Sequence, residues 1–231
     1  MKSFLKILSG NSFFYSINLY LISILTFLLL AFSRKDGFVW LNQFHDSFLN
    51  FLFEKITFLG DGWFIIALGL FFMLFKKYQT LAWIILLSYI SSGIFAQILK
   101  HMISSPRPSV FFKMHQYQYY LDTFATSRIG FKSFPSGHTA SFFALATVLS
   151  NYWKKRQLCI VLVLLSVLVG YSRIYLAHHF LIDVFAGAII GIAFGSLSAI
   201  WIKPLIKVAT TTKKNKSLAF SESPTNTLLN Q

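Results

Sequence analysis

Residues 158–202 read LCIVLVLLSVLVGYSRIYLAHHFLIDVFAGAIIGIAFGSLSAIWI, two apolar runs separated by a short segment with Arg173, His179 and Asp183. Together with flanking turns, each run approaches the roughly 20 residues that a membrane-crossing helix needs. Ionisable side chains are costly in or beside a bilayer, and they usually mark a site or a pathway there. The stretch therefore predicts two membrane helices with a functional site where they join.

The whole chain has the composition of a membrane protein. Its 231 residues are 55% hydrophobic and 12% charged, which predicts an all-α, six-helix transmembrane bundle in one domain, residues 1–208. Residues 209–231, rich in Thr, Lys, Asn and Ser, are predicted to form a disordered basic cytoplasmic tail. The first apolar run is too long for a signal peptide, so we expect a retained helix. The predicted spans are Phe13–Phe32, Phe58–Phe75, Leu81–Leu99, Thr139–Trp153, Leu158–Tyr171 and Phe180–Ile202.

The net charge of +14 does not indicate a nucleic-acid partner, because of where the charges lie. With the N-terminus inside, the cytoplasmic segments carry most Lys and Arg residues and one acid, Glu222. The positive-inside rule then places both termini in the cytoplasm. The ionisable clusters fall on the extracytoplasmic side, and the excess charge is expected to attract anionic membrane lipids.

Two segments on that side are predicted to lie near the headgroups. Apolar residues recur at helical spacing from Leu41 to Leu59, which predicts an amphipathic helix on the outer interface or a helix packed over the bundle mouth. The loop from His101 to Phe134 is rich in Phe and Tyr. Such residues are typical of an interfacial belt; a lid that contacts lipid chains is the alternative.

Three polar clusters border the apolar runs: Lys100 to Arg107, Ser136 to His138, and Arg173 to Asp183. Phosphoryl transfer relies on positioning and on stabilising negative charge, and three cations at Lys100, Arg107 and Arg173 suit that task. Ser136 and Gly137 precede an apolar run, which predicts a helix start where free N–H groups bind an anion. His138 would place a proton donor beside that anion.

His179 and Asp183 are four residues apart and would share one face of a helix. The acid would fix the histidine tautomer, leaving the other nitrogen to act as a nucleophile. His178 is the rival imidazole, but it has no acid four residues on. Gly187, Gly191 and Gly195 continue the stripe and predict close helix packing, which would turn the pair inward. Carboxylates are too scattered to predict a metal site or any other cofactor.

The sequence resembles the type-2 phosphatidic acid phosphatase superfamily of membrane enzymes. The resemblance rests on Lys100 with Arg107-Pro108, on Pro135-Ser136-Gly137-His138, and on Ser172-Arg173 with His179 and Asp183. It implies a six-helix, metal-independent phosphatase. In the family pattern His179 attacks phosphorus, Asp183 orients it, and His138 protonates the leaving oxygen. The residues that would bind phosphate oxygens are Lys100, Arg107, Ser136, Gly137 and Arg173.

These observations lead us to expect a multi-pass enzyme of the cell membrane that hydrolyses a lipid phosphate or diphosphate on the extracytoplasmic face. Polyprenyl diphosphate is favoured, because the chain is compact and lacks a large soluble headgroup-binding domain. Lipid A phosphates and phosphatidylglycerol phosphate stay open as substrates. A catalytically silent lipid-binding or transport protein is the alternative of another class.

Overall fold

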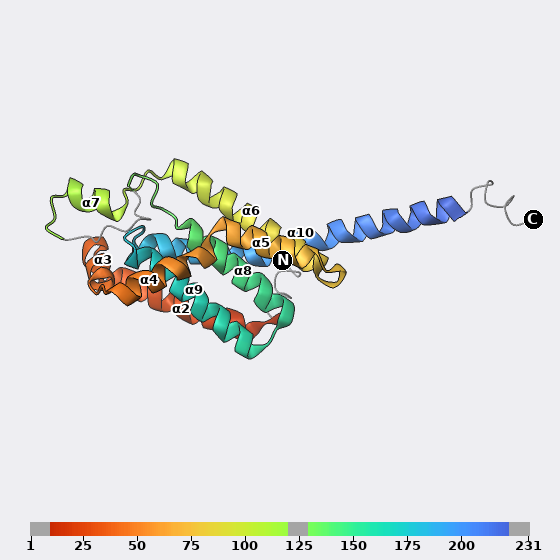
Figure 1. Ribbon diagram of the computed structural model, residues 1–231, viewed down its shortest axis with the longest axis horizontal. Coiled ribbons are helices and arrows are strands. Elements are labelled where there is room, and N and C mark those ends of the chain that lie inside the picture. The colour runs from red at the N-terminus through yellow and green to blue at the C-terminus, as the bar shows by residue number, and fades with distance from the viewer. Residues whose placement is uncertain (1–9, 120–128, 222–231) are drawn as a thin grey trace, which may run out of the picture.

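The computed structural model describes the backbone of residues 10–119 and 129–221, with side chains as far as Trp201. In these ranges the chain forms a bundle of helices, shown in Figure 1, and contains no strand apart from an isolated bridge between Ser105 and Lys132. The predicted all-α class is therefore confirmed. The longer elements are α2 (Ser12–Ala31), α3 (Arg34–Asn42), α4 (Ser47–Ile56), α5 (Gly62–Met73), α6 (Gln79–Met102), α7 (Pro108–Met114), α8 (Gly137–Trp153), α9 (Arg156–Tyr175) and α10 (Leu181–Ser221), and two 3₁₀ turns are η1 (Thr57–Gly60) and η2 (Lys76–Tyr78).

Each of the six predicted spans overlaps a helix: α2, α5, α6, α8, α9 or α10. Four helices of the described part are long and apolar enough to cross a membrane alone. A fifth crossing is possible if Ser47–Gly60 and Gly62–Met73, which are bent by 53°, form one broken span. Helix α8 has 17 residues and is enclosed by its neighbours. The count of six spans therefore stays a prediction.

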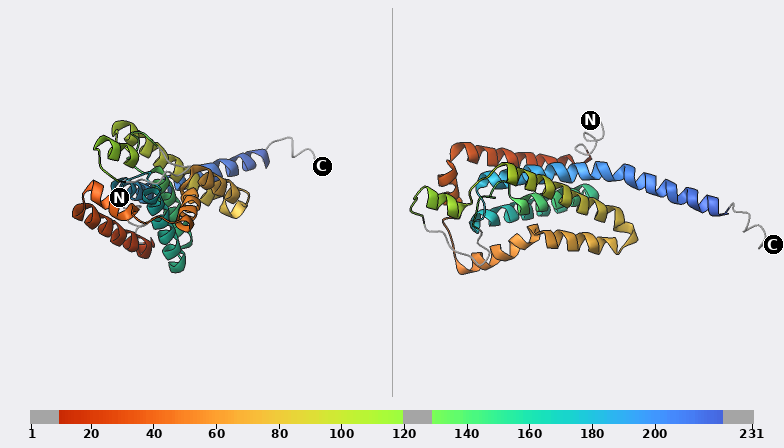
Figure 2. Two further views of the ribbon diagram at one scale, coloured as in Figure 1. Left: turned by 60° about the vertical axis from the view of Figure 1, so that its left-hand side comes forward. Right: turned by 90° about the horizontal axis from the view of Figure 1, so that it is seen from above.

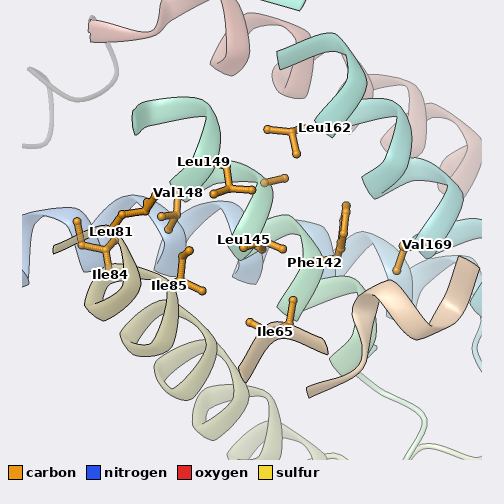
Figure 3. Close-up of a cluster of buried hydrophobic side chains, with 11 residues drawn as sticks. Ile65, Leu81, Ile84, Ile85, Phe142, Leu145, Val148, Leu149, Leu162 and Val169 are labelled. Carbon is orange, nitrogen blue, oxygen red and sulfur yellow. The ribbon is translucent and has the colours of Figure 1, made fainter. Parts of the chain in front are cut away.

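Helix α8 occupies the centre of the bundle. Every residue from Thr139 to Ser150 is buried, and α10, α6 and α9 pack around it. Figure 3 shows part of this core, where Phe142 and Leu145 of α8 lie among side chains of α5, α6 and α9. A helix that is buried on all sides holds its first turn in a fixed place, and that turn carries the Ser136 to His138 cluster.

The glycine stripe of α10 packs against α8, as the spacing predicts. A Cβ atom added at Gly191 would lie 2.5 Å from the Ala140 carbonyl oxygen, and Gly187 and Gly195 approach α8 almost as closely. Any larger side chain would push the two helices apart, since real Cβ atoms do not come this near to backbone oxygens. The stripe therefore fixes the start of α10 beside the start of α8.

The ionisable clusters meet at one end of the bundle because the long helices α6, α8, α9 and α10 end or begin there. Helices α6 and α9 end there, at Met102 and Tyr175, and α8 and α10 begin there. Figure 2 shows that α10 extends beyond the other helices at the opposite end. It continues as a helix to Ser221, and residues 222–231 lie outside the described part. The predicted boundary near residue 208 and the disordered tail stay predictions.

The predicted amphipathic helix from Leu41 to Leu59 is divided. Helix α3 ends at Asn42, and α4 begins at Ser47, where the Asp46 carboxylate accepts hydrogen bonds from two backbone N–H groups of the first turn. An aspartate in this position starts a new helix. The apolar spacing therefore runs across two separate helices, α3 and α4. Helix α4 exposes Phe48 and Phe51 on one side and buries Phe53 against the end of α9.

The aromatic loop after α6 is described only in part. Its first section forms α7, whose Phe112 is buried against Phe38 of α3. Phe111 of the same helix contacts Phe180, just before α10. These rings form a cluster over the site end of the bundle. Phe124, which the belt and lid hypotheses both include, lies outside the described residues, so the choice between belt and lid stays open.

Candidate active site

The first turn of α8 is where the sequence predicts an anion-binding position. Ser136 is fully buried and caps the helix, and its backbone N–H donates to the Asp183 carbonyl oxygen at 2.9 Å. A Cβ atom at Gly137 would lie 3.7 Å from Lys100 Nζ, so the lysine from the end of α6 reaches this turn. Unpaired N–H groups at a helix start attract anions, and an ammonium group beside them adds to that attraction.

Arg107 connects the first cluster to the third. It is 6% exposed, and its Nη1 donates to the His178 carbonyl oxygen at 2.9 Å. Its Nη2 donates to the Lys132 carbonyl oxygen at 3.2 Å. These two bonds to backbone oxygens orient the guanidinium, and they place Arg107 directly beside the segment that carries His179.

Arg173 lies at the buried end of α9 and is 2% exposed. Its guanidinium donates to Thr57 Oγ1 and contacts the Nδ1 atom of His178. The Arg173 carbonyl oxygen accepts the N–H groups of both His178 and His179. Side chain and main chain of one residue thus fix the turn between α9 and α10.

His179 and Asp183 meet as predicted, but the reason is different. Helix α10 begins only at Leu181, so His179 precedes the helix and the two residues do not share a helical face. Instead, Asp183 Oδ2 accepts the backbone N–H of Phe180 at 2.9 Å, as a capping acid does in a first turn. This turn brings His179 Nδ1 to 3.5 Å from Asp183 Oδ2.

That 3.5 Å separation is longer than an ordinary hydrogen bond, and neither His179 Nδ1 nor Asp183 Oδ1 has a hydrogen-bond partner among the described residues. Contacts between catalytic groups are often long before substrate binds. A third group fixes the carboxylate, since Ser133 Oγ donates to Asp183 Oδ2 at 2.5 Å. Both members of the pair are buried, His179 at 2% exposure and Asp183 at 0%.

His179 lies in a strongly electropositive environment. Burial is the main cause that holds its pKa well below the ordinary value, and the charges of Arg173, Arg107 and Lys100 lower the pKa further. The three predicted cations therefore act on this imidazole together. A neutral histidine keeps a lone pair for attack, and the positive charges of these three side chains suit a phosphate.

His138 occupies a more open position than His179. Its Nε2 lies 3.6 Å from Asp61 Oδ2, with the two side chains 18% and 32% exposed. A Cβ atom at Gly60 would lie 2.7 Å from the His138 carbonyl oxygen. The glycine thus allows the start of α5 to approach α8 and brings Asp61 to the histidine.

Sequence reasoning missed several residues of the site. Asp61 was not among the residues that the sequence singled out, although it is an acid between two glycines before an apolar run. Ser133, two residues before Pro135, gave no signal of its own. Thr57 and His178 contact Arg173. The spacing of these residues in the sequence did not predict either contact. Within the described ranges, no group of three or more His, Cys, Asp or Glu side chains is arranged to hold a metal ion.

Comparison with known proteins supports the resemblance. The PAP2 superfamily model matches residues 81–207, which is more than half of the chain and includes all three clusters. The probable lipid phosphate phosphatase 4 of Arabidopsis thaliana is 33% identical over 141 residues, which span 51% of this chain but only 46% of that protein. A lipid A 1-phosphatase of Rhizobium etli is 30% identical over 167 residues, covering 64% of this chain and 68% of that protein.

A solved structure has the same arrangement of helices. The crystal structure of LpxE from Aquifex aeolicus superposes with a TM-score of 0.61 at 32% identity, over 70% of this chain and 91% of that one. Residues 81–207, which the superfamily model matches, contain the buried histidine, its acid and the cations that surround them. The chain therefore belongs to the PAP2 superfamily.

Proposed function

We propose that this protein is a membrane lipid phosphatase that hydrolyses a lipid phosphate or diphosphate, with polyprenyl diphosphate as the first candidate, through a phosphohistidine at His179. One observation carries the proposal: a buried histidine faces a carboxylate and is surrounded by three cations at one end of an apolar bundle. The names of the relatives, a lipid phosphate phosphatase and a lipid A phosphatase, agree with it.

His179 is the nucleophile in this proposal. Its Nδ1 faces Asp183, so Nε2 is the nitrogen that attacks phosphorus. Asp183 holds the proton-bearing Nδ1 toward itself and stabilises the positive charge that the ring gains as the N–P bond forms. His138 protonates the leaving oxygen and later accepts a proton from the water that cleaves the phosphohistidine. Hydrolysis then returns inorganic phosphate and neutral His179.

The phosphate oxygens are bound by Lys100, Arg107 and Arg173, by the hydroxyl group of Ser136 and by the backbone N–H of Gly137, because the Ser136 N–H already donates to the Asp183 carbonyl oxygen. Charge spreads over the oxygens as the phosphoryl group is transferred. Donors that are already fixed in place stabilise this charge without reorganising. No metal is needed in this scheme, and that independence is itself a proposal.

The active site is placed on the extracytoplasmic face, with both termini in the cytoplasm. The distribution of Lys and Arg supports this orientation. The four helix ends that carry the three clusters all lie at one end of the bundle, where a lipid headgroup would present its phosphate. The membrane supplies the substrate laterally, so membrane lipids are the expected partners.

A lipid A phosphatase is the second candidate, and the LpxE structure and the Rhizobium relative favour it. Phosphatidylglycerol phosphate is a third substrate. These lipids share the phosphate and differ in the remainder of the headgroup, which the site residues named above do not contact in our scheme. The substrate must therefore be decided by measurement.

A phosphate-release panel in detergent tests the function. Purified protein is assayed with polyprenyl diphosphate, lipid A, phosphatidylglycerol phosphate and phosphatidate, together with His179→Ala and with His115→Ala as an exposed-histidine control. We expect release by the wild type and by His115→Ala and none by His179→Ala. Equal release by His179→Ala would overturn the nucleophile assignment, and no release from any lipid phosphate would favour the silent lipid-binding protein.

Two additions to the panel test the mechanism. Activity should persist in strong chelators, and a loss that Mg²⁺ restores would contradict the metal-free scheme. Vanadate, which adopts the five-coordinate geometry of phosphorus in transfer, should inhibit. Full activity at high vanadate would argue against attack by histidine.

A further inference from the structure

The segment before Ser133 is fixed to the first cluster through its main chain. Arg107 donates its backbone N–H to the Gly130 carbonyl oxygen at 2.9 Å, and Ser133 donates to the Ser105 carbonyl oxygen at 3.0 Å. Arg107 Nη2 donates to the Lys132 carbonyl oxygen between them. The Lys132 backbone is therefore held in register with the phosphate-binding loop, although its side chain is exposed.

The Lys132 side chain is held as well. Its Nζ lies 3.3 Å from His101 Nε2, while His101 Nδ1 lies 2.7 Å from the Gln97 carbonyl oxygen. A carbonyl oxygen can only accept, so Nδ1 carries the proton, and Nε2 of the neutral ring must accept from the ammonium group. His101 thus works as a support that directs Lys132 and does not compete with it for an anion.

This ammonium group is close to the catalytic residues. Lys132 precedes Ser133, whose hydroxyl holds Asp183, and His101 follows Lys100. Lys132 and Arg107 also line one surface hollow of about 460 Å³ together with Ile129, Gly130 and Phe131. In the described part of the chain no carboxylate forms an ion pair with Lys132. A directed cation without an acid, beside a phosphate-binding arginine, is suited to a second anionic group.

We propose that Lys132, supported by His101, is a second anion subsite that binds the phosphate remaining on the lipid, so that lipid diphosphates are the preferred substrate class. This inference rests on the proposed function. His179 attacks the terminal phosphorus, the P–O bond of the anhydride breaks, and its electron pair stays with the lipid monophosphate. Water then cleaves the N–P bond, so that lipid diphosphate and water give lipid monophosphate and inorganic phosphate.

Lys132 acts on the leaving group, and this sets the selectivity. In a diphosphate, the oxygen that leaves belongs to a second phosphate whose negative charge grows as the bond breaks, and a nearby ammonium group stabilises that growth. In a monophosphate, the leaving oxygen belongs to an alcohol and brings no second phosphate to the subsite. Removing the Lys132 charge should therefore affect diphosphate hydrolysis selectively.

The test compares farnesyl diphosphate with farnesyl monophosphate, which differ only in the second phosphate. For Lys132→Gln we expect kcat/KM to fall roughly tenfold with the diphosphate, the size of one charge-assisted hydrogen bond, and to change less than about twofold with the monophosphate. Lys113→Gln, which removes an exposed lysine on α7, is the matched control and should leave both values unchanged.

Variants of His101 test whether this side chain directs Lys132, separately from the charge of Lys132 itself. His101→Gln keeps an acceptor for Lys132 and should retain most of the selectivity, whereas His101→Ala should lose it as Lys132→Gln does. An equal loss on both substrates in Lys132→Gln, or no loss on either, would overturn the subsite while leaving the phosphatase intact. Failure of the wild-type protein to release phosphate from either substrate, or from the lipid panel, would instead overturn the function.

Discussion

The two histidines of the site are paired in similar ways but differ in their surroundings. His179 lies 3.5 Å from Asp183, and His138 lies 3.6 Å from Asp61. The first pair is closed to solvent, with side chains 3% and 0% exposed, and the second is partly open, at 18% and 32%. The histidine–acid distance is almost constant, so burial is what distinguishes the pairs.

This difference supports two separate tasks. Burial and three cations favour the neutral form of His179, as a nucleophile requires. His138 is open enough to exchange protons with water, as an acid that must be recharged in each cycle requires. We therefore propose that the same residue type serves two roles, because α8 and the α9–α10 turn place it at different depths.

The largest expected effect comes from replacing each histidine in turn. His179→Ala should abolish turnover of every substrate, including an aryl phosphate with a good leaving group, because no N–P bond can form. His138→Ala should slow a lipid phosphate by roughly 10²–10⁴-fold, the usual contribution of a general acid. With p-nitrophenyl phosphate the burst of p-nitrophenol, which reports the first step alone, should be nearly as fast in His138→Ala as in the wild type, since that leaving group needs no proton, while the later attack of water stays slow.

Steady-state phosphate release from the lipid and the burst of p-nitrophenol from the aryl phosphate give this comparison, and thermal melting in detergent checks that both variants are folded. If the aryl phosphate rescues His179→Ala instead of His138→Ala, the two roles are exchanged.

The second effect tests how the buried acid acts. Asp183→Asn keeps the shape and an acceptor oxygen for Ser133 and Phe180 but removes the charge, and kcat should fall by roughly 10²-fold or more. Ser133→Ala leaves the charge and removes one donor, so the fall should be about tenfold. Initial rates at saturating substrate measure both. A larger loss in Ser133→Ala than in Asp183→Asn would mean that positioning, not charge, dominates.

The sequence was sufficient to predict which residues gather, because membrane spans that follow one another in the chain cross in opposite directions, and this puts the clusters at one end. It predicted the contact between His179 and Asp183 through a shared helix face, and that reason was wrong. The capping bond from Phe180 to Asp183 starts α10 two residues after His179. Spacing of four residues fits both arrangements, so spacing alone does not distinguish them.

Long-range contacts were the part that the sequence did not predict. Asp61 reaches His138 only because Gly60 permits a close approach of α5 to α8. Ser133 reaches Asp183 across 50 positions of the chain. Such contacts depend on how helices pack. The local spacing of residues in one sequence does not show which distant helices will lie side by side. The break in the predicted amphipathic helix at Asp46 is a different case, because it depends on a local signal. Aspartate is a residue type that often precedes a helix, but the apolar spacing continues across it, and the prediction followed the spacing.

The third effect concerns the acid limb of the pH profile. The pKa of His179 is lowered mainly by burial and further by Arg173, Arg107 and Lys100. Its neutral form should therefore persist below pH ~6.5, the ordinary histidine value, and kcat/KM should fall only as the pH drops through the lowered pKa. Lys100→Met removes one of the cations, so the pKa of His179 should rise and the acid limb should move to higher pH.

The pH profiles of kcat/KM for the wild type and Lys100→Met with one substrate measure that shift. Ionisation of the substrate affects both profiles equally, so it does not contribute to the difference. Lys113→Met removes an exposed charge of α7 and should leave the limb in place. An acid limb that moves to lower pH in Lys100→Met would contradict the assignment of His179 as the group that must be neutral.

The smallest expected effect on turnover comes from the partly exposed pair, His138 and Asp61. Asp61 also caps α5 by accepting the Trp63 N–H at 2.9 Å, and asparagine caps a helix equally well. Asp61→Asn therefore removes the charge beside His138 without removing the cap. Because the pair is partly exposed, its interaction is worth roughly 0.2–1 kcal/mol, so kcat should fall only about twofold to fivefold. A loss as large as that of Asp183→Asn would show that exposure does not separate the two pairs.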